Sequence, residues 1–261
     1  MDQFMKAAIE EAKLFMVMAL RLLLAALFSI SSFSAMRAQP QLGTENNEPV
    51  YSNRDISGWT VHIRKELLAV DSAKTELALS LLKAQLDEIV RVVPAQAVTE
   101  LKKVPLWVSP EYPATPPRAE YHPGAGWLRD NHRDPTMVKG VEFTNVRIFE
   151  AETRRMPNFA LHELSHAYHD RVLSKGFDNA ELKSAYETAK QSGKYDRVER
   201  QDSEGRKKQD KAYAMTNPQE YFAESTEAYF SRNDFFPFDR NELEQHDPDT
   251  LKLIAKLWGT K

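Results

Sequence analysis

The first regular alternation of apolar and polar positions lies at residues 59–63, which read Trp-Thr-Val-His-Ile. A period of two is typical of a strand with one buried face. Residues 72–93 then carry Leu, Ile and Val at spacings of three and four until Pro94, which is the pattern of a helix with one apolar face. The pattern therefore predicts a strand followed by a long helix.

Three more apolar segments predict strands, at residues 105–108, 119–122 and 140–149. The proline-rich segment 110–117 and a loop at 124–139 separate them. After Pro157 the spacing is helical almost to the end of the chain, apart from a charged break at 197–211. This order predicts an α+β fold in which a small twisted sheet packs on the long helix and a mainly helical C-terminal part follows.

The N-terminal region has a different composition. Residues 14–33 are mostly Leu, Ala, Met, Phe and Ile, and small and then polar residues follow them. This profile is typical of a signal peptide, and a single membrane-anchoring helix, which Arg21 would interrupt, is the alternative. We expect a signal peptide or N-terminal membrane segment at 1–38, a polar linker at 39–53, one domain at 54–261, and a secreted or extracytoplasmic protein.

Charge and cysteine content narrow the function classes. The chain has 261 residues, of which 35 are basic and 38 acidic, and the two signs are well mixed. Such a surface does not favour nucleic acid, and membrane contact is expected only through an uncleaved N-terminal segment. There is no cysteine, so disulfides and thiol chemistry are excluded. A metal site in this chain must use His, Asp or Glu.

One such site is indicated by His162-Glu163-Leu164-Ser165-His166. On a helix His166 lies about 40° and Glu163 about 100° around the axis from His162, so the three share one side. Two imidazoles one turn apart can bind one metal ion, and Glu163 can accept a proton from a water molecule that the ion activates. The alternative is a surface helix with two hydrogen-bonded histidines. Residues Pro157 and Asn158 suit a helix start just before the motif.

A catalytic zinc ion needs a third protein ligand. His169 lies about 10 Å along the helix from His162. We therefore expect an ordinary surface histidine there, or one that supports the site from the side. Glu220, in the segment 217–230, is the better candidate. Its alternative is a capping box with Asn217, because Pro218 suits the first helical position.

Two further acidic residues of the same segment, Glu224 and Glu227, have an alternative of their own. They can form a solvated acidic stripe on the helix surface, without any part in a metal site.

Together, the His162–His166 motif and the segment 213–224, Tyr-Ala-Met-Thr-Asn-Pro-Gln-Glu-Tyr-Phe-Ala-Glu, resemble the catalytic domain of anthrax lethal factor and its relatives, within the gluzincins. The resemblance implies a zincin-like fold, Glu220 as third ligand, Tyr213 as donor to the developing oxyanion, and Glu224 as the carboxylate that holds a ligand histidine in place. A packed aromatic is the alternative for Tyr213. Ser165, where a glycine is common, and a longer gap that contains the charged loop 201–211 depart from the family.

These observations predict a zinc-dependent endopeptidase with one Zn2+ ion and a protein or peptide substrate. Glu163 is the expected general base, and His162, His166 and Glu220 are the expected ligands. A noncatalytic zinc-bearing binding module and an inactive relative at the cell surface are the two alternatives, and the intact Glu163 argues against a purely structural site.

Overall fold

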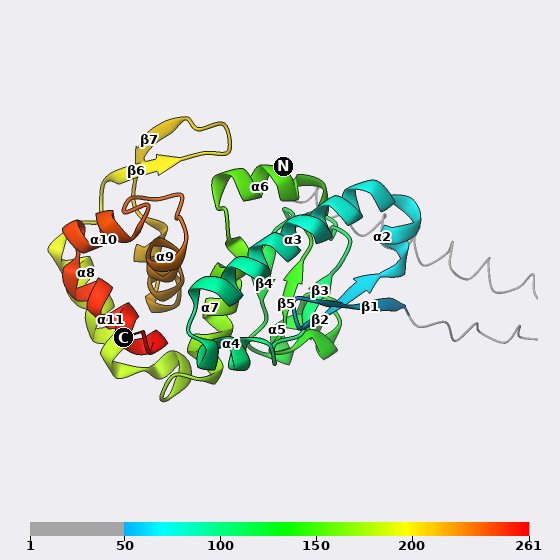
Figure 1. Cartoon of the computed structure of the whole chain (residues 1–261), viewed down its shortest axis with the longest axis horizontal. Coiled ribbons are helices and arrows are strands. Elements are labelled where there is room, and N and C mark those ends of the chain that lie inside the picture. Colours follow the sequence, from blue (N-terminus) through cyan, green and yellow to red (C-terminus); the bar gives the residue numbers. More distant parts are fainter. Residues whose placement is uncertain (1–49, 261) are drawn as a thin grey trace, which may run out of the picture. The chain divides into compact units, whose positions relative to one another are not determined.

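The computed structural model describes residues 50–260, which lie within one compact unit, Glu48–Lys261 (Figure 1). The signal peptide or membrane segment expected at 1–38 lies outside the described residues. Within 50–260, none of the helices is both long and apolar enough to span a membrane.

A five-stranded sheet in the order β1-β2-β3-β5-β4 forms the first half of the described chain. Strand β1 (Tyr51–Ile56) pairs antiparallel with β2 (Trp59–Arg64) through a two-residue turn in which Ser57 and Gly58 both have positive φ. This is the turn geometry that suits a twisted hairpin. Strands β2, β3 (Leu106–Val108) and β5 (Val141–Phe143) are parallel, and β4 (Ala119–Tyr121) is an antiparallel edge strand.

Helix α3 (Ser72–Val92) runs across one face of the sheet (Figure 1). Its buried residues recur at helical spacing and include Ala78, Leu82, Leu86 and Ile89, which pack in the main core with strand residues such as Ile63. Short helices α2 (Lys65–Val70) and α4 (Ala95–Leu101) flank it. The predicted sheet packed on a long helix is therefore confirmed.

The C-terminal part is mainly helical, as predicted. Helix α7 (Phe159–Arg171) contacts α3, β4 and α9 (Pro218–Phe230). Helices α8 (Ala180–Ser192), α10 (Arg240–His246) and α11 (Pro248–Trp258) group around α9 in Figure 1. Trp258 joins α11 to both central helices, because its ring stacks on Tyr168 and its Nε1–H donates to Thr226 Oγ1 over 2.9 Å.

The structure corrects four local predictions. Strand β1 was missed, and its first residues fall in the expected linker 39–53. The strand expected over 140–149 stops at Phe143, and the short helix α6 (Phe149–Arg155) follows. The expected loop 124–139 contains α5 (Ala125–Asp130). The charged break is an antiparallel hairpin of β6 (Val198–Gln201) and β7 (Lys207–Asp210), so the expected loop 201–211 is mostly hairpin.

Candidate metal centre and cleft

The start of α7 is fixed by hydrogen bonds to the long helix α3. Asn158 caps α7 by accepting from the Leu161 backbone N–H over 3.1 Å, and its Nδ2 donates to the Gln85 carbonyl. The Gln85 side chain in turn accepts from the Ala160 N–H over 2.9 Å. All the free backbone donors of a helix end need partners. These contacts satisfy two of them and set the position of the motif one turn later.

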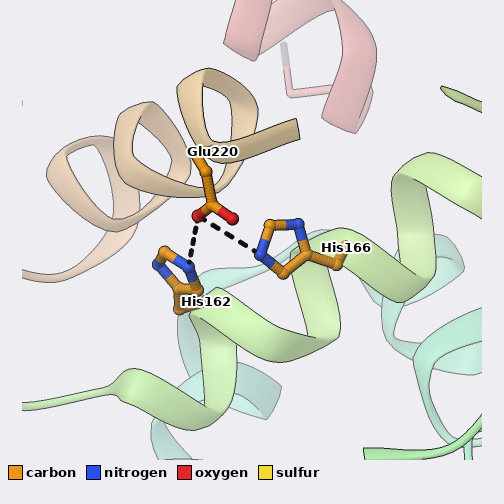
Figure 2. A group of neighbouring side chains, drawn as sticks. All are labelled: His162, His166 and Glu220. Carbon is orange, nitrogen blue, oxygen red and sulfur yellow. Dashed lines mark hydrogen bonds and ion pairs between the residues drawn. The ribbon is translucent and has the colours of Figure 1, made fainter. Parts of the chain in front are cut away.

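Helix α7 brings the two motif histidines to one carboxylate of α9 (Figure 2). His162 Nε2 lies 3.1 Å and His166 Nε2 lies 3.5 Å from Glu220 Oε2. The side chains of the three residues are 7%, 12% and 16% exposed, so the group is shielded but open on one side. All three donor atoms fall within 4.8 Å of one another. A site of two imidazole nitrogens and one carboxylate oxygen results, in which His162 and Glu220 lie 58 residues apart in sequence.

Glu220 owes its place to the start of α9. Asn217 Oδ1 accepts from the Glu220 N–H over 2.9 Å and Pro218 follows at the first helical position. The predicted N-cap is therefore present, but the Glu220 carboxylate points at the histidines (Figure 2). Burial raises the pKa of this carboxyl, and hydrogen bonds from His162 and His166 outweigh that effect and hold it below its usual range.

The contact expected of Glu224 is made by Glu227. His162 Nδ1 lies 2.8 Å from Glu227 Oε2 and 3.8 Å from Glu224 Oε1. Both carboxylates are buried, with 2% and 0% of the residue exposed, so the solvated acidic stripe is wrong. Burial raises the pKa of both carboxyls. A carboxylate on the second ring nitrogen fixes the tautomer of a metal-binding histidine and leaves Nε2 free to coordinate.

Glu163 faces the cleft from the same helix. Its Oε2 accepts a hydrogen bond of 2.9 Å from the Tyr121 backbone N–H in the edge strand β4. The carboxylate therefore has one oxygen held by the strand. Glu163 and the two histidines line a cleft of about 610 Å³, a volume within the usual range of ligand-binding sites.

Tyr213 also lines this cleft, at the start of the short 3-10 turn Tyr213–Met215 before α9. It is 47% exposed, which contradicts the alternative of a packed aromatic. Partial burial and the charge of Glu220 raise the pKa of its phenol. The hydroxyl therefore stays protonated at neutral pH and can donate a hydrogen bond.

The expectation of a surface position for His169 is wrong. This residue is fully buried, and its ring packs edge-on against Phe177 and Phe222 at 5.0 and 5.3 Å between centroids. Neither ring nitrogen has a hydrogen-bond partner. Burial is the main reason that its pKa falls to about 4. It packs beneath the site, one turn after His166, and does not line the cleft.

The end of the cleft near α6 carries a charged cluster that the sequence reasoning missed. The buried carboxylate of Asp234 accepts from Arg155 Nη1 over 2.7 Å and from Arg200 Nε over 3.2 Å. Arg200 belongs to β6, and a bridge between Arg200 and Phe235 ties the hairpin to the cleft wall. Arg155, Arg200 and Asp234 are far apart in the sequence, and their spacing did not predict that they lie together.

The contact of Glu227 with the histidine motif could have been anticipated from its position in the sequence. It follows Glu220 by seven residues, which is two helical turns, and Glu224 follows by four. All three therefore share one helix face. Which of the three carboxylates contacts which histidine nitrogen depends on how α9 crosses α7. The spacing of residues within α9 does not determine this crossing.

The donor set fits a divalent cation. Without a metal ion, His162 can donate to both Glu220 and Glu227 only as an imidazolium; burial lowers its pKa, but the neighbouring carboxylates of Glu227 and Glu220 outweigh burial and raise that pKa well above its usual value. A divalent cation at the point where the three donor atoms converge would take the place of the Nε2 protons. Imidazole nitrogen with one carboxylate oxygen is a ligand set that zinc uses in catalytic sites.

Comparison with known proteins agrees with this geometry. Residues 128–257 match the family model described as anthrax toxin lethal factor, N- and C-terminal domain. The match contains α7 and α9 with every residue of the His-His-Glu group, and it extends beyond the two motifs on both sides. No curated protein and no solved structure matches the chain. Residues 128–257 thus form a domain of the anthrax toxin lethal factor family.

Proposed function

We propose that this chain is a zinc-dependent endopeptidase with a zincin-like fold, which hydrolyses protein or peptide substrates in the cleft between β4, α7 and α9. The observation that carries the proposal is the convergence of His162, His166 and Glu220 in a cleft that Glu163 also lines. A zinc ion bound there would polarise the scissile carbonyl and lower the pKa of a water molecule to about 7.

The residues of the chain divide the remaining work. Glu163 accepts the proton of the attacking water and later delivers it to the leaving amine. Tyr213 donates its hydroxyl to the oxygen on which negative charge develops. Glu227 holds His162 in the tautomer that presents Nε2 to the ion. Glu224 lies behind the same ring at a longer distance and supports this arrangement.

A noncatalytic zinc module is the rival function. A structural zinc site is closed by four protein ligands, whereas the group here offers three and opens into a cleft of about 610 Å³. A carboxylate at Glu163 that lines the cleft also has no use in a structural site. These features favour catalysis over a binding module or an inactive relative.

The decisive variant is Glu163→Gln, which preserves the shape of the side chain but cannot accept a proton. We expect it to retain one zinc ion per chain and to lose hydrolysis of casein and of a peptide library by several orders of magnitude. Zinc is measured by elemental analysis after gel filtration. Equal cleavage by the wild type and the variant would exclude Glu163 as the base, and no cleavage by the zinc-loaded wild type would favour the binding module.

We also propose that the protein works outside the cytoplasm, on the basis of the composition of residues 14–33. A fusion of residues 1–50 to a reporter that is active only after export tests this point. Retention of the reporter inside the cell would contradict it.

A further inference from the structure

The general base of the proposed reaction is held by strand β4. Glu163 Oε2 accepts the Tyr121 N–H over 2.9 Å, and the Tyr121 hydroxyl donates to Asp170 Oδ2, two helical turns further along α7, over 2.7 Å. Strand and helix are therefore joined within the motif and again beyond its C-terminal end. The direction in which the Glu163 carboxylate points depends on where β4 lies.

Strand β4 is three residues long and lies at the edge of the described sheet, where it pairs with β5. Backbone bonds between Arg118 and Thr144 and between His122 and Gly140 continue this pairing by one residue at each end, and side-chain contacts add to it. Side chains alternate along a strand, so Glu120 and His122 lie on the face of the sheet opposite to Tyr121. On that face Glu120 stands directly across from Glu142 of β5. Two carboxylates in this arrangement repel each other unless a cation bridges them.

Arg133 provides the bridge. Its Nη1 lies 2.7 Å from Glu120 Oε2 and 3.1 Å from Glu142 Oε2. His122 Nε2 also contacts Glu142 Oε2 at 3.0 Å. Both residues that flank Tyr121 are thus tied to the single carboxylate of Glu142, one directly and one through the guanidinium.

Glu142 itself is rigidly placed. It is fully buried, and its other oxygen, Oε1, accepts from the Tyr112 hydroxyl over 2.8 Å. Burial raises its pKa, but the hydrogen bonds from His122 and Tyr112 contribute to holding the pKa below the usual range, so the group is ionised at neutral pH. An ionised, fully buried carboxylate with several donors is costly to disturb.

We propose that Glu142 is a positioning residue for catalysis: by holding Glu120 and His122 on the face of the sheet opposite to Tyr121 it fixes Tyr121, and through the Tyr121 N–H it aims the carboxylate of Glu163. This inference rests on the proposed peptidase function. Glu142 touches neither substrate nor metal and acts only through β4. Small displacements of a catalytic group cost large factors in rate, so a weakened anchor lowers kcat.

Two variants and one control separate positioning from plain stability. Glu142→Gln removes the charge and preserves the shape, and Tyr112→Phe removes one donor to Glu142. Tyr195→Phe removes a comparable buried hydroxyl that donates to Asp247 over 3.2 Å, in the helical part of the chain. We expect Glu142→Gln to lower kcat about tenfold and Tyr112→Phe to lower it about threefold, with KM and zinc content unchanged. Tyr195→Phe leaves kcat at the wild-type value.

A double-mutant cycle shows whether the effect passes through Glu163. If it does, Glu142→Gln has no further effect on the residual activity of Glu163→Gln, so the two losses are not additive. Full additivity, or a fall in KM and kcat that Tyr195→Phe reproduces, would overturn the inference.

Hydrogen exchange gives a readout that needs no enzymatic activity. The Tyr121 amide is protected by its bond to Glu163, so in zinc-loaded protein it should exchange at least tenfold faster in Glu142→Gln than in the wild type, while amides of α11 keep their rates. Unchanged protection at Tyr121 would refute the positioning role even if the chain proved to have no peptidase activity. An inactive wild type with the expected loss of protection would instead count only against the proposed function.

Discussion

Glu227 Oε2 lies 2.8 Å from His162 Nδ1, on the side of the imidazole that faces away from Glu220. This single ring is therefore held between two carboxylates of α9 and turned so that Nε2 faces the cleft. Glu227 is fully buried, and among the described residues its Oε2 bonds to His162 while its Oε1 has no hydrogen-bond partner.

The first prediction concerns this pair. Glu227→Gln should weaken zinc binding about 10- to 100-fold, because the histidine loses the anion that fixes its tautomer. Glu224→Gln, at 3.8 Å from the same nitrogen, is the matched control and should weaken binding less. Competition with a chromophoric chelator measures both affinities. A larger loss in Glu224→Gln would give the orienting role to Glu224, as the family resemblance implied.

Loss of bound zinc distinguishes the three proposed metal ligands from neighbouring residues that do not bind the ion. Removing one of three ligands leaves the ion poorly coordinated. We expect Glu220→Ala, His162→Ala and His166→Ala each to lose stoichiometric zinc in dialysis against metal-free buffer, whereas Gln219→Ala, at the neighbouring position on α9, retains it. Full zinc retention by Glu220→Ala would remove the third ligand and turn attention to Glu224.

Tyr213→Phe tests the oxyanion donor. Tyr213 is about half exposed and lines the cleft, so loss of its hydroxyl should not change the melting temperature. If it bonds the developing oxyanion more strongly than the substrate carbonyl, kcat falls roughly 100-fold while KM changes little. Steady-state kinetics on one fluorogenic peptide decides the matter. A wild-type kcat would show that Tyr213 takes no part in the reaction.

Arg200 is the residue of the β6–β7 hairpin that lines the described cleft. We expect Arg200→Ala to raise KM for peptide substrates several-fold and to spare zinc, because it changes one wall of the cleft but no ligand. Arg206→Ala is the control: this side chain is 76% exposed and pairs with Asp202 within the hairpin turn. Equal kinetics for both variants would mean that the hairpin is an ordinary solvated insertion.

His169 gives a prediction for stability against pH. The pKa of His169 is about 4 in the folded chain and about 6.5 in the unfolded chain. Between about pH 4 and 6.5, His169 is therefore mostly protonated in the unfolded state and mostly neutral in the folded state. Stability from this group is complete above about pH 6.5 and is lost as the pH falls. The loss reaches roughly 2.5 kcal/mol at pH 4.5.

The comparison variant for this effect is His169→Leu, which fills similar space and does not titrate. Urea unfolding of the metal-free proteins at several pH values gives both free energies. The fall between pH 7 and 4.5 should be smaller in the variant by roughly the amount above. Parallel curves for the two proteins would show that His169 is protonated, or solvated, in the folded state.

The sequence by itself determined the elements that carry the site and the chemistry they offer. The spacing of apolar residues predicted β2, α3, β3 and β4, and Asn217 with Pro218 correctly marked the start of α9. His162, Glu163 and His166 were found because a helix places residues four apart on one side, which is a local rule. The absence of cysteine limited the ligands to histidine and carboxylate.

Only the tertiary structure decided which carboxylate meets which histidine and what supports the base. Glu220, Glu224 and Glu227 share one face of α9, and the way α9 crosses α7 alone sends Glu220 to Nε2 and Glu227 to Nδ1 of His162. The bond from Tyr121 to Glu163 likewise joins residues 42 positions apart. Such pairings depend on packing between distant segments. The burial of His169, which the sequence placed at the surface, has the same origin. Periodicity describes one element and does not show which neighbouring element covers it.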